Sequence, residues 1–407
     1  MEKRKKILVA PLNWGLGHAT RCLPIIEELR RQGAVVVVAS DGIALEWLRK
    51  ELPADIEIHA LPPYNIRYPF ENMLVSMALQ MPKILRGAIR EHFWLRDFLK
   101  KNAVDAVISD NRFGFFSRRT RSIFLTHQVN IQMPIRFLEP FVNAVNQFFI
   151  RRFDVCWIPD AADSTVNLSG KLAHVSSITN VTSANASDGV TRSHPVTKQI
   201  SLEINYLGAL SRMKNFPSEK KYCLAVVLSG PEPQRTILEK IILKQIVEVA
   251  TSRKPKAASR EPQAESGEQQ AANDTFLFVR GTNQPFAFST AEHLLKHNIE
   301  LHNLLTTNDL NRKMLESEVV ICRSGYSTIM DLAVLKLPAV LIPTPGQTEQ
   351  EYLAERLAAD RRFVHQKQSA FDLAAALRAV PTMRGFVDLP TDDGETLRQI
   401  IRELLEF

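Results

Sequence analysis

The chain has 407 residues, of which 45% are hydrophobic and 23% are charged. This length and composition are ordinary for a globular protein with two domains that each bury a core. No apolar run approaches the roughly 18 to 20 residues needed to cross a bilayer, which excludes an integral membrane protein. The formal net charge of +7 favours an anionic partner such as a nucleotide-sugar or an anionic membrane surface. Nucleic acid is the weakest such partner, because basic and aromatic residues do not interleave as in known RNA- or DNA-binding modules.

The N-terminus predicts a first strand rather than an export signal. Ile7 to Leu12 is a short apolar run, and it leads to Asn13 and His18 instead of the small residues of a cleavage site. We therefore expect a cytoplasmic protein. The cysteines lie far apart and lack CxxC spacing, which predicts neither a disulfide framework nor a zinc site.

The first half of the chain alternates predicted strands with predicted helices. Apolar runs typical of buried parallel strands lie at 7–10, 34–39, 56–60, 106–109 and 123–126. Helical spacing of apolar residues covers 20–32, 43–51 and 72–101. This alternation predicts a parallel α/β sheet. The Ser-, Thr-, Asn- and Gly-rich segment 163–199 predicts a loop insertion before a further strand at 204–208.

The alternation resumes in the second half of the chain. Strands are predicted at 224–228, 276–279, 319–322 and 339–342, with a helix at 234–249. The segment 251–273 lacks apolar anchors and predicts a disordered surface loop. We expect an N-terminal Rossmann-like domain at 1–214, a C-terminal one at 215–390, and a final helix within 391–407 that could pack on either.

The loop after the first strand is a candidate ligand-binding site. Gly15 and Gly17 let the backbone approach a ligand, and the next helix N-terminus offers free N–H groups. Thr20 breaks the GxGxxG dinucleotide fingerprint, so a structural turn is the alternative. His18 lies where a parallel strand ends, and its ordinary pKa near 6.5 suits proton transfer.

Other polar residues follow strands in the same half. Asp110 ends a strand and is a second candidate base, or it orients His18. Asn111, Arg112 and His127 are candidates to line an acceptor cleft. A purely structural role is the alternative for each of these residues.

Two further candidates lie in the second half. Ser229 and Gly230 form a strand–turn–helix loop suited to phosphate, although a lone Ser-Gly is often only a turn. The more specific pattern runs from Arg323 and Ser324 to Gln350. In this pattern a polar glycine loop can surround a diphosphate, Asp331 can accept hydrogen bonds from ribose hydroxyls, and Gln350 can bind sugar hydroxyls.

The pattern from Arg323 to Gln350 resembles a known protein family. Residues 323–352, RSGYSTIMDLAVLKLPAVLIPTPGQTEQEY, resemble the donor-binding half of the GT-B glycosyltransferases, and most closely family 28. The opening GLGHATRCLPIIEELRRQG resembles the Gly-Gly-His loop of the same family. The chain also resembles uncharacterised glycosyltransferase-like proteins that carry WGLGHATR and SGPEPQR.

The resemblance implies a GT-B fold, with two Rossmann-like doubly wound domains facing across a cleft. It implies that Gly325 and Thr328 lie at the pyrophosphate, Asp331 at the ribose and Gln350 at the donor sugar. The chain departs from the family pattern twice. Asp331 replaces a glutamate, and Glu351 replaces a second glutamine, which leaves the identity of the sugar open.

We therefore expect a glycosyltransferase that needs neither a metal nor a cofactor. It would transfer a sugar from a nucleotide-sugar, a UDP-sugar by resemblance, to an unidentified glycan, lipid or small molecule, with His18 as the base. Backbone N–H groups near Ser229, Gly230 and Gly325, with Arg323, would stabilise the leaving nucleotide. Residues 17–23 also resemble a UDP-sugar hydrolase, so hydrolysis by activated water is an alternative, as is non-catalytic nucleotide-sugar binding.

A second hypothesis concerns membranes. Residues 137–153 combine phenylalanines with arginines, which is typical of an interfacial amphipathic helix. A buried core helix explains the same pattern equally well. The corresponding expectation is peripheral contact with the inner face of an anionic membrane.

Overall fold

The computed structural model describes residues 4–64, 73–173, 202–252, 275–284, 286, 298–390 and 394–407. The chain divides into two compact units, Met1–Leu210 with Asp392–Phe407, and Ser211–Thr391. The second unit thus begins at residue 211 where the sequence suggested 215, and the C-terminal helix belongs to the first unit. Most of the predicted loops at 163–199 and 251–273 lies outside the described residues.

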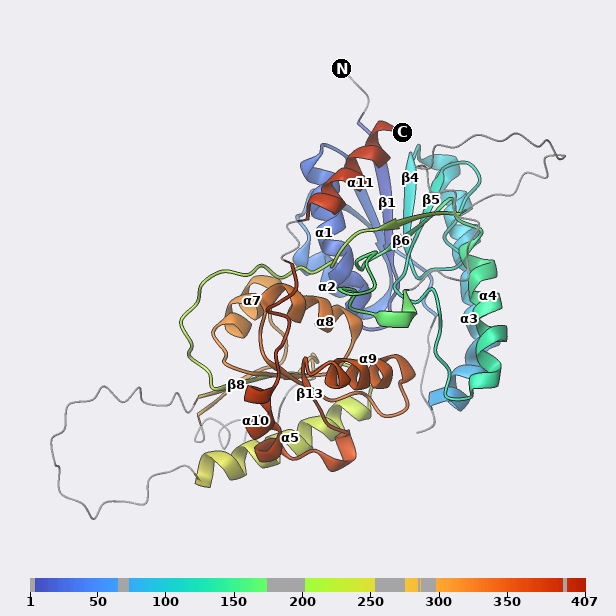
Figure 1. Ribbon diagram of the computed structural model, residues 1–407. Coiled ribbons are helices and arrows are strands. Elements are labelled where there is room, and N and C mark those ends of the chain that lie inside the picture. Colours follow the sequence, from blue (N-terminus) through green and yellow to red (C-terminus); the bar gives the residue numbers. More distant parts are fainter. Residues whose placement is uncertain are drawn as a thin grey trace, which may run out of the picture. The chain divides into compact units, whose positions relative to one another are not determined.

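The first unit is built on a seven-stranded parallel sheet with the order β3-β2-β1-β4-β5-β6-β7. Its strands are β1 (Lys6–Pro11), β2 (Val35–Ser40), β3 (Glu57–Ala60), β4 (Ala106–Asp110), β5 (Arg121–Leu125), β6 (Val155–Ile158) and β7 (Glu203–Tyr206). Its helices are α1 (Gly17–Arg31), α2 (Gly42–Glu51), α3 (Met73–Lys101), α4 (Glu139–Ile150) and α11 (Glu395–Glu406), with short 3₁₀ turns η1 (Arg136–Leu138) and η2 (Gly170–Leu172). Figure 1 shows this sheet with its covering helices.

The central strands of this sheet are apolar on both faces. β1 reads KILVAP and β2 reads VVVVAS, and all but the first residue of each is buried. Strands that helices cover on both faces need this continuous pattern. The connection from α1 to β2 turns at Gly33, whose φ of 88° lies in the left-handed region. There the N–H of Ala34 donates to Leu29 O and that of Gly33 to Arg30 O, which ends α1 in a Schellman motif.

The second unit has a six-stranded parallel sheet with the order β10-β9-β8-β11-β12-β13. Its strands are β8 (Leu224–Val227), β9 (Phe276–Val279), β10 (Ile299–His302), β11 (Val320–Cys322), β12 (Ala339–Leu341) and β13 (Val364–His365). Its described helices are α5 (Gln234–Ser252), α7 (Thr307–Leu315), α8 (Tyr326–Leu335), α9 (Thr348–Ala359) and α10 (Leu373–Ala379), with η3 (Gln368–Ala370) and η4 (Val380–Thr382).

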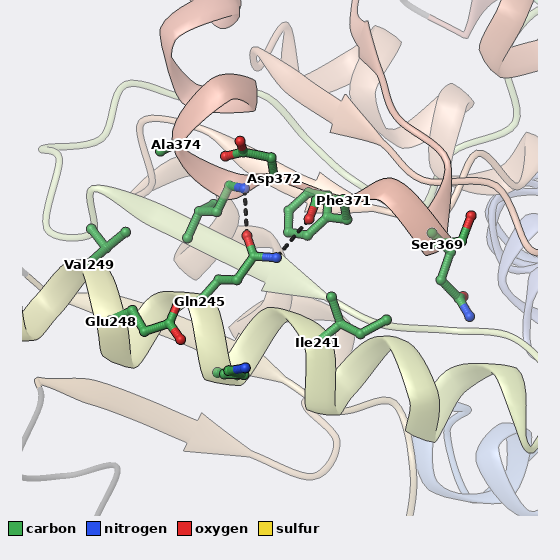
Figure 2. Close-up of a pocket in the computed structure, with 11 residues that line it drawn as sticks. Ile241, Gln245, Glu248, Val249, Ser369, Phe371, Asp372 and Ala374 are labelled. Carbon is green, nitrogen blue, oxygen red and sulfur yellow. Dashed lines mark hydrogen bonds between the residues drawn. The ribbon is translucent and has the colours of Figure 1, made fainter.

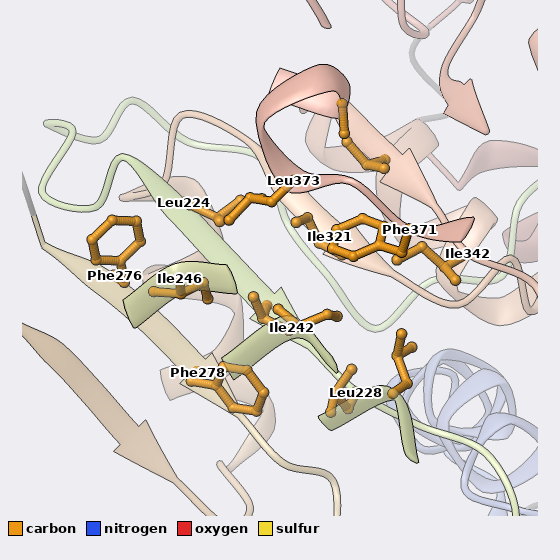
Figure 3. Packing of buried hydrophobic residues seen from close by; sticks show 14 of the residues in the cluster. Leu224, Leu228, Ile242, Ile246, Phe276, Phe278, Ile321, Ile342, Phe371 and Leu373 are labelled. Atoms are coloured by element: carbon orange, nitrogen blue, oxygen red, sulfur yellow. The ribbon is translucent and has the colours of Figure 1, made fainter. Parts of the chain in front are cut away.

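One face of the second sheet packs against α5 and α10, as Figure 3 shows. Leu224 and Val226 alternate along β8 toward this face, and α5 presents Ile242 and Ile246 at helical spacing. Leu373 completes the contact from α10, and all of these side chains are buried. Each such aliphatic side chain contributes about 1.5–3 kcal/mol when it is removed from water. This packed core fixes the positions of the strand ends, from which the polar loops of the unit extend.

Both sheets reverse their strand order beside their first strand. In the first unit β1 lies between β2 and β4, and in the second β8 lies between β9 and β11. Doubly wound sheets bind ligands at the carboxyl ends of the strands at such a switch point. The loops after β1 and β4 therefore meet in the first unit, and those after β8 and β11 meet in the second. Within the described residues, no helix is long and apolar enough to cross a membrane.

Candidate functional site

His18 and Asp110 meet at the switch point of the first unit. His18 lies in the first turn of α1, after a loop in which Gly15 has a φ of 83°, while Asp110 is the last residue of β4. His18 Nδ1 is 2.9 Å from Asp110 Oδ1. The Asp110 side chain is fully buried, whereas that of His18 is 15% exposed. The structure thus joins these two predicted residues and gives Asp110 the geometry to orient the imidazole.

Arg21 completes this cluster, and the sequence analysis did not select it. Its guanidinium donates two hydrogen bonds to the Asp110 carboxylate, from Nε to Oδ2 at 2.7 Å and from Nη2 to Oδ1. Its Nη1 lies 2.8 Å from Nδ1 of His127, which follows β5. The signal for Arg21 was its position three residues after His18 on α1, since residues spaced by three share one face of a helix.

The charges in this cluster set its protonation states. Burial opposes ionisation of Asp110, but the neighbouring Arg21 and His18 outweigh it and hold the pKa of that carboxyl well below its ordinary value. Burial lowers the pKa of His18, with Arg21 and His127 acting in the same direction and Asp110 against it. The arrangement therefore pairs an ionised carboxylate with an imidazole that is neutral near pH 7.

Arg112 has a different environment from the one expected. Its side chain is fully buried, and its guanidinium forms ion pairs with Glu91 and Asp41. Its Nε donates to Pro11 O at 3.0 Å, and Tyr64 donates to Glu91 at 2.5 Å. The expectation that Arg112 lines an open acceptor cleft is wrong, because the guanidinium binds the carboxylates inside the fold.

The other two residues predicted for an acceptor cleft differ from one another. Asn111 is half-buried and has a φ of 55°, a left-handed conformation that asparagine tolerates at the sharp turn after β4. His127 is buried at the end of β5 and contacts Arg21. His127 thus belongs to the cluster around Asp110, and the role of Asn111 stays a prediction.

The second unit brings the predicted loops after β8 and β11 together. Ser229 and Gly230 are exposed, and Gly230 has a φ of 108° that favours glycine. A Cβ placed on Gly230 would lie 3.5 Å from Thr344 Oγ1 and 4.0 Å from Arg323 Nε. Thr344 was not predicted, although it follows β12 at the same edge of the sheet.

Arg323 is a buried cation whose hydrogen-bond partners are neutral oxygens. It is fully buried, and Nη1 donates to Ile342 O and Pro343 O at 3.2 and 3.0 Å. Nη2 donates to Gln234 O at 2.9 Å and to the Gln368 amide oxygen at 2.7 Å. Burial lowers its pKa to about 10. Within the described residues, Arg323 Nε and Thr344 Oγ1 are buried without a hydrogen-bond partner, and both face Gly230.

Gln350 packs beside the glycine loop that precedes α8. Its amide oxygen accepts from the Thr344 N–H at 2.8 Å, and its backbone oxygen accepts from Ser324 Oγ at 2.7 Å. Its Nε2 lies 3.9 Å from where a Cβ on Gly325 would stand, and Gly325 is the N-terminal cap of α8. Thr328 is half-buried in the first turn of that helix. The structure therefore brings Ser324, Gly325 and Gln350 together beside Arg323.

Asp331 lies further along α8 and contacts the start of its own unit. Its Oδ1 accepts from Ser211 Oγ at 2.6 Å. Burial raises the pKa of Asp331 to about 6, although Arg212 and Ser211 act in the opposite direction. Contact with a ribose at this carboxylate stays a prediction.

A separate hollow of about 660 Å³ lies between α5 and the segment around α10. Figure 2 shows Gln245 reaching across it. The Gln245 Nε2 donates to Phe371 O, and its Oε1 accepts from the Leu373 N–H, at 2.7 Å each. The hollow contains none of the predicted donor-binding residues. Elsewhere in the part of the chain that the structure describes, no three His, Cys, Asp or Glu side chains are grouped to hold an ion.

Comparison with known proteins relates the second unit to one family. Residues 242–384 match the model of the Glycosyltransferase family 28 C-terminal domain. The chain is 40% identical over 52 residues to a Methylobacterium radiotolerans enzyme named UDP-N-acetylglucosamine--N-acetylmuramyl-(pentapeptide) pyrophosphoryl-undecaprenol N-acetylglucosamine transferase. That match covers 13% of this chain and 14% of the relative, so the chain is matched over only about a seventh of that relative's length.

Solved structures are similar over nearly the whole chain. Acinetobacter baumannii MurG superposes with a TM-score of 0.53 at 14% identity, covering 98% of this chain and 100% of that one. CalG4, the calicheamicin glycosyltransferase, gives a TM-score of 0.55 at 12% identity, covering 99% and 95%. At these identities the likeness concerns the fold, which is the predicted GT-B architecture of two parallel-sheet α/β domains.

Proposed function

We propose that this chain, which has a GT-B fold and matches the family 28 C-terminal domain over residues 242–384, is a glycosyltransferase that uses a nucleotide-sugar donor. The observation that carries the proposal is Arg323. A cation removed from water is costly unless an anion compensates it, and Arg323 donates to neutral oxygens. A diphosphate at Gly230 would supply the missing charge and accept from Arg323 Nε and Thr344 Oγ1.

The loops around Arg323 suit such an anion. Gly325 is the N-terminal cap of α8, and a helix N-terminus directs backbone N–H groups and a partial positive charge at an anion. Gly230 lacks a side chain where one would approach Arg323 and Thr344. We assign the diphosphate to these two loops, the ribose to Asp331 and the sugar to Gln350. The name of the Methylobacterium radiotolerans relative includes UDP-N-acetylglucosamine, which supports UDP as the nucleotide.

We assign proton removal to His18. In the transfer, the acceptor hydroxyl loses its proton to His18 while its oxygen bonds to the anomeric carbon of the donor sugar. The bond from that carbon to the diphosphate oxygen breaks, and the nucleoside diphosphate leaves with the electron pair. Asp110 stabilises the imidazolium that forms, as a carboxylate does beside a catalytic histidine.

We further propose that the reaction needs no metal ion. The leaving diphosphate gains negative charge as its bond to the sugar breaks. Arg323 and the N–H groups at the start of α8 would stabilise that charge, which is the role that a divalent cation has in other enzymes.

A direct assay tests the proposal. UDP-, GDP-, CMP- and TDP-sugars are screened for thermal stabilisation, and the labelled sugar that binds is then incubated alone and with lipid, glycan and small-molecule acceptors. We expect acceptor-dependent transfer, and we expect His18→Ala to lower turnover about 10²- to 10⁴-fold with unchanged donor affinity. Acceptor-independent release of free sugar would make the enzyme a hydrolase. Binding without turnover in the unmodified protein would make it a non-catalytic binder.

The acceptor is the least defined partner, and we propose that it is presented at a membrane surface. Along α3 the side chains of Met81, Leu85, Ile89 and Phe93 are exposed at four-residue spacing. Phe137, Phe141 and Phe148 are exposed on η1 and α4, and the exposed Arg86, Arg90, Arg136 and Arg151 accompany them. Phe116 links the two helices, since it contacts His92 of α3 and lies near Arg152 after α4. Apolar side chains with arginines suit an anionic membrane interface.

Sedimentation with vesicles tests the membrane proposal. The protein should sediment with anionic phospholipid vesicles at low salt more than with zwitterionic ones. Replacing Phe137 and Phe141 by serine should reduce that binding, whereas Ile43→Ser, at an exposed position on α2, should not. Absence of sedimentation at low salt would refute this surface as a membrane contact.

A further inference from the structure

One guanidinium organises two histidines in the first unit. Arg21 uses Nε and Nη2 for the Asp110 carboxylate and directs Nη1 to His127. His18 Nδ1 lies on the other side of Asp110 Oδ1, at 2.9 Å, and 3.0 Å from Arg21 Nη2. The cluster is closed by Cys22, whose thiol donates to Asp110 Oδ2 at 3.4 Å. These contacts favour a different tautomer in each imidazole.

For His18 the carboxylate decides the position of the hydrogen. Asp110 is ionised and can only accept, so a bare Nδ1 at 2.9 Å would place two acceptors against one another. Nη2 of Arg21 can also direct a hydrogen at His18 Nδ1, from 3.0 Å, but the charged carboxylate is the nearer partner of Nδ1. Nδ1 of His18 therefore carries the hydrogen and donates it to Asp110. In the neutral ring, Nε2 then holds the lone pair.

For His127 the guanidinium decides in the opposite way. Arginine has only donors, so His127 Nδ1 at 2.8 Å from Nη1 must accept and carries no hydrogen. The neutral ring of His127 then has its hydrogen on Nε2. An imidazolium would set two donors against one another at this distance.

We infer that Arg21 is a positioning residue, which holds Asp110 against His18 and donates to His127, so that the two histidines have opposite tautomers: His18 Nε2 is a proton acceptor and His127 Nε2 is a hydrogen-bond donor. The inference deepens the proposed function, and its catalytic meaning rests on that proposal. Of the two histidines in the cluster, only His18 can serve as the base, and His127 can only donate to an oxygen. The charged or titratable groups that act on His18 are Asp110, Arg21 and His127, while Arg112 acts on Cys22.

Nitrogen-15 NMR of the histidine side chains tests the inference without any turnover. In the full chain near pH 7.5, His18 should show a protonated Nδ1 and a bare Nε2, and His127 the reverse. The variants His18→Gln and His127→Gln assign the signals. The same tautomer in both rings would overturn the inference. Opposite tautomers in a protein that turns over no nucleotide-sugar would leave it standing while the proposed function fails.

Kinetics of the positioning residue give a second readout. Arg21→Gln should lower kcat about 100-fold with little change in the donor KM, because proton transfer by a positioned base contributes about 10²- to 10⁴-fold. It should also move the acidic limb of the pH profile to higher pH, since Arg21 lowers the pKa of His18. Arg21→Lys is the matched control. Lysine keeps the positive charge but cannot donate two parallel hydrogen bonds to Asp110. The acidic limb of the pH profile should therefore return closer to its original pH than kcat returns to its original value.

His127→Asn separates the roles of the two rings if the Arg21 variants do not fold. Its amide oxygen can still accept from Arg21, but it has no donor at the position of Nε2. The acidic limb should remain where it is in the unmodified protein, with a smaller fall in kcat than in His18→Ala. Loss of the limb in His127→Asn would make His127 the base and overturn the inference.

Discussion

Arg112 and Arg323 are both fully buried arginines at the ends of parallel strands, one in each unit. Arg112 binds two carboxylates, those of Glu91 and Asp41. Arg323 binds carbonyl and amide oxygens only, and its Nε is left without a partner in the described part of the chain. The two arginines are therefore equally buried, but within the described residues carboxylates neutralise the charge of Arg112 and not that of Arg323. A cation that the fold neutralises supports the structure, whereas one that the fold leaves uncompensated is suited to an anionic ligand.

The largest effect is expected from replacing Arg112, the arginine whose charge is neutralised by carboxylates. Arg112→Met keeps an apolar side chain of similar length but removes the ion-pair partner that Glu91 and Asp41 share. The free energy of unfolding in urea should fall by about 3–5 kcal/mol. Replacing the exposed Arg118 by methionine should change it by less than about 0.5 kcal/mol. A loss below about 1 kcal/mol for Arg112→Met would contradict a stabilising role for these ion pairs.

The matching change on the uncompensated side should act on ligand binding rather than on folding. Arg323→Met removes a costly buried charge along with its hydrogen bonds, so stability should change by less than about 2 kcal/mol. The affinity for UDP, measured by calorimetry, should fall about 10- to 100-fold, because hydrogen bonds to charged groups contribute about 1.5–3 kcal/mol. Arg323→Lys should lie between the two, since lysine keeps the charge but not the fork. Unchanged UDP affinity in Arg323→Met would contradict the anion site.

A smaller effect is expected at Asp331, whose pKa burial raises to about 6. A raised carboxyl pKa means stability that is complete near pH 4 and is lost as the pH rises through 6. Asp331→Asn should therefore be more stable than the unmodified protein at pH 7, by about 1–2 kcal/mol, with the difference vanishing near pH 4.

Asp309 provides the control of opposite sign. A hydrogen bond from Thr306 lowers its pKa, so Asp309→Asn should be the less stable form at pH 7, and this difference should shrink as the pH falls. Urea unfolding checks the pair, for Asp331→Asn from pH 7 to pH 4 and for Asp309→Asn from pH 7 to about pH 2. A stability difference for Asp331→Asn that does not change with pH would disprove the raised pKa.

The smallest expected effect comes from chelation. If Arg323 and backbone N–H groups supply the charge at the leaving group, EDTA should leave turnover unchanged within about twofold. Loss of activity in EDTA and its recovery with a divalent cation would assign that charge to a metal instead.

The fold was predictable from the sequence because its signals are local. Apolar runs such as 7–10 and 34–39, separated by helical spacing, predict parallel strands, and strand ends predict the positions of His18, Asp110 and Arg323. All three lie at the switch points of the observed sheets. The resemblance to family 28 glycosyltransferases added the grouping of Gly325 with Gln350, and the two do lie together.

The remaining features depend on contacts between residues far apart in the chain. Arg112 is buried because Glu91 and Asp41, 21 and 71 residues away, reach its guanidinium. Asp331 meets Ser211 across 120 residues. No local period encodes such pairs, so the sequence suggested an acceptor-cleft role for Arg112 and did not predict the contact between Asp331 and Ser211. Arg21 was the exception, since its spacing from His18 was visible in the sequence.

The helix α11 has a consequence for how the chain folds as it is made. Its buried Leu397, Ile401 and Leu404 belong to the first unit, where Gln32 donates to Arg398 O at 2.8 Å. The segment that completes the first unit is therefore synthesised only after the whole of Ser211–Thr391. During synthesis the second unit can close its core while the first still lacks its final helix. A chain that ends shortly before residue 395 would carry a complete second unit attached to an unfinished first unit.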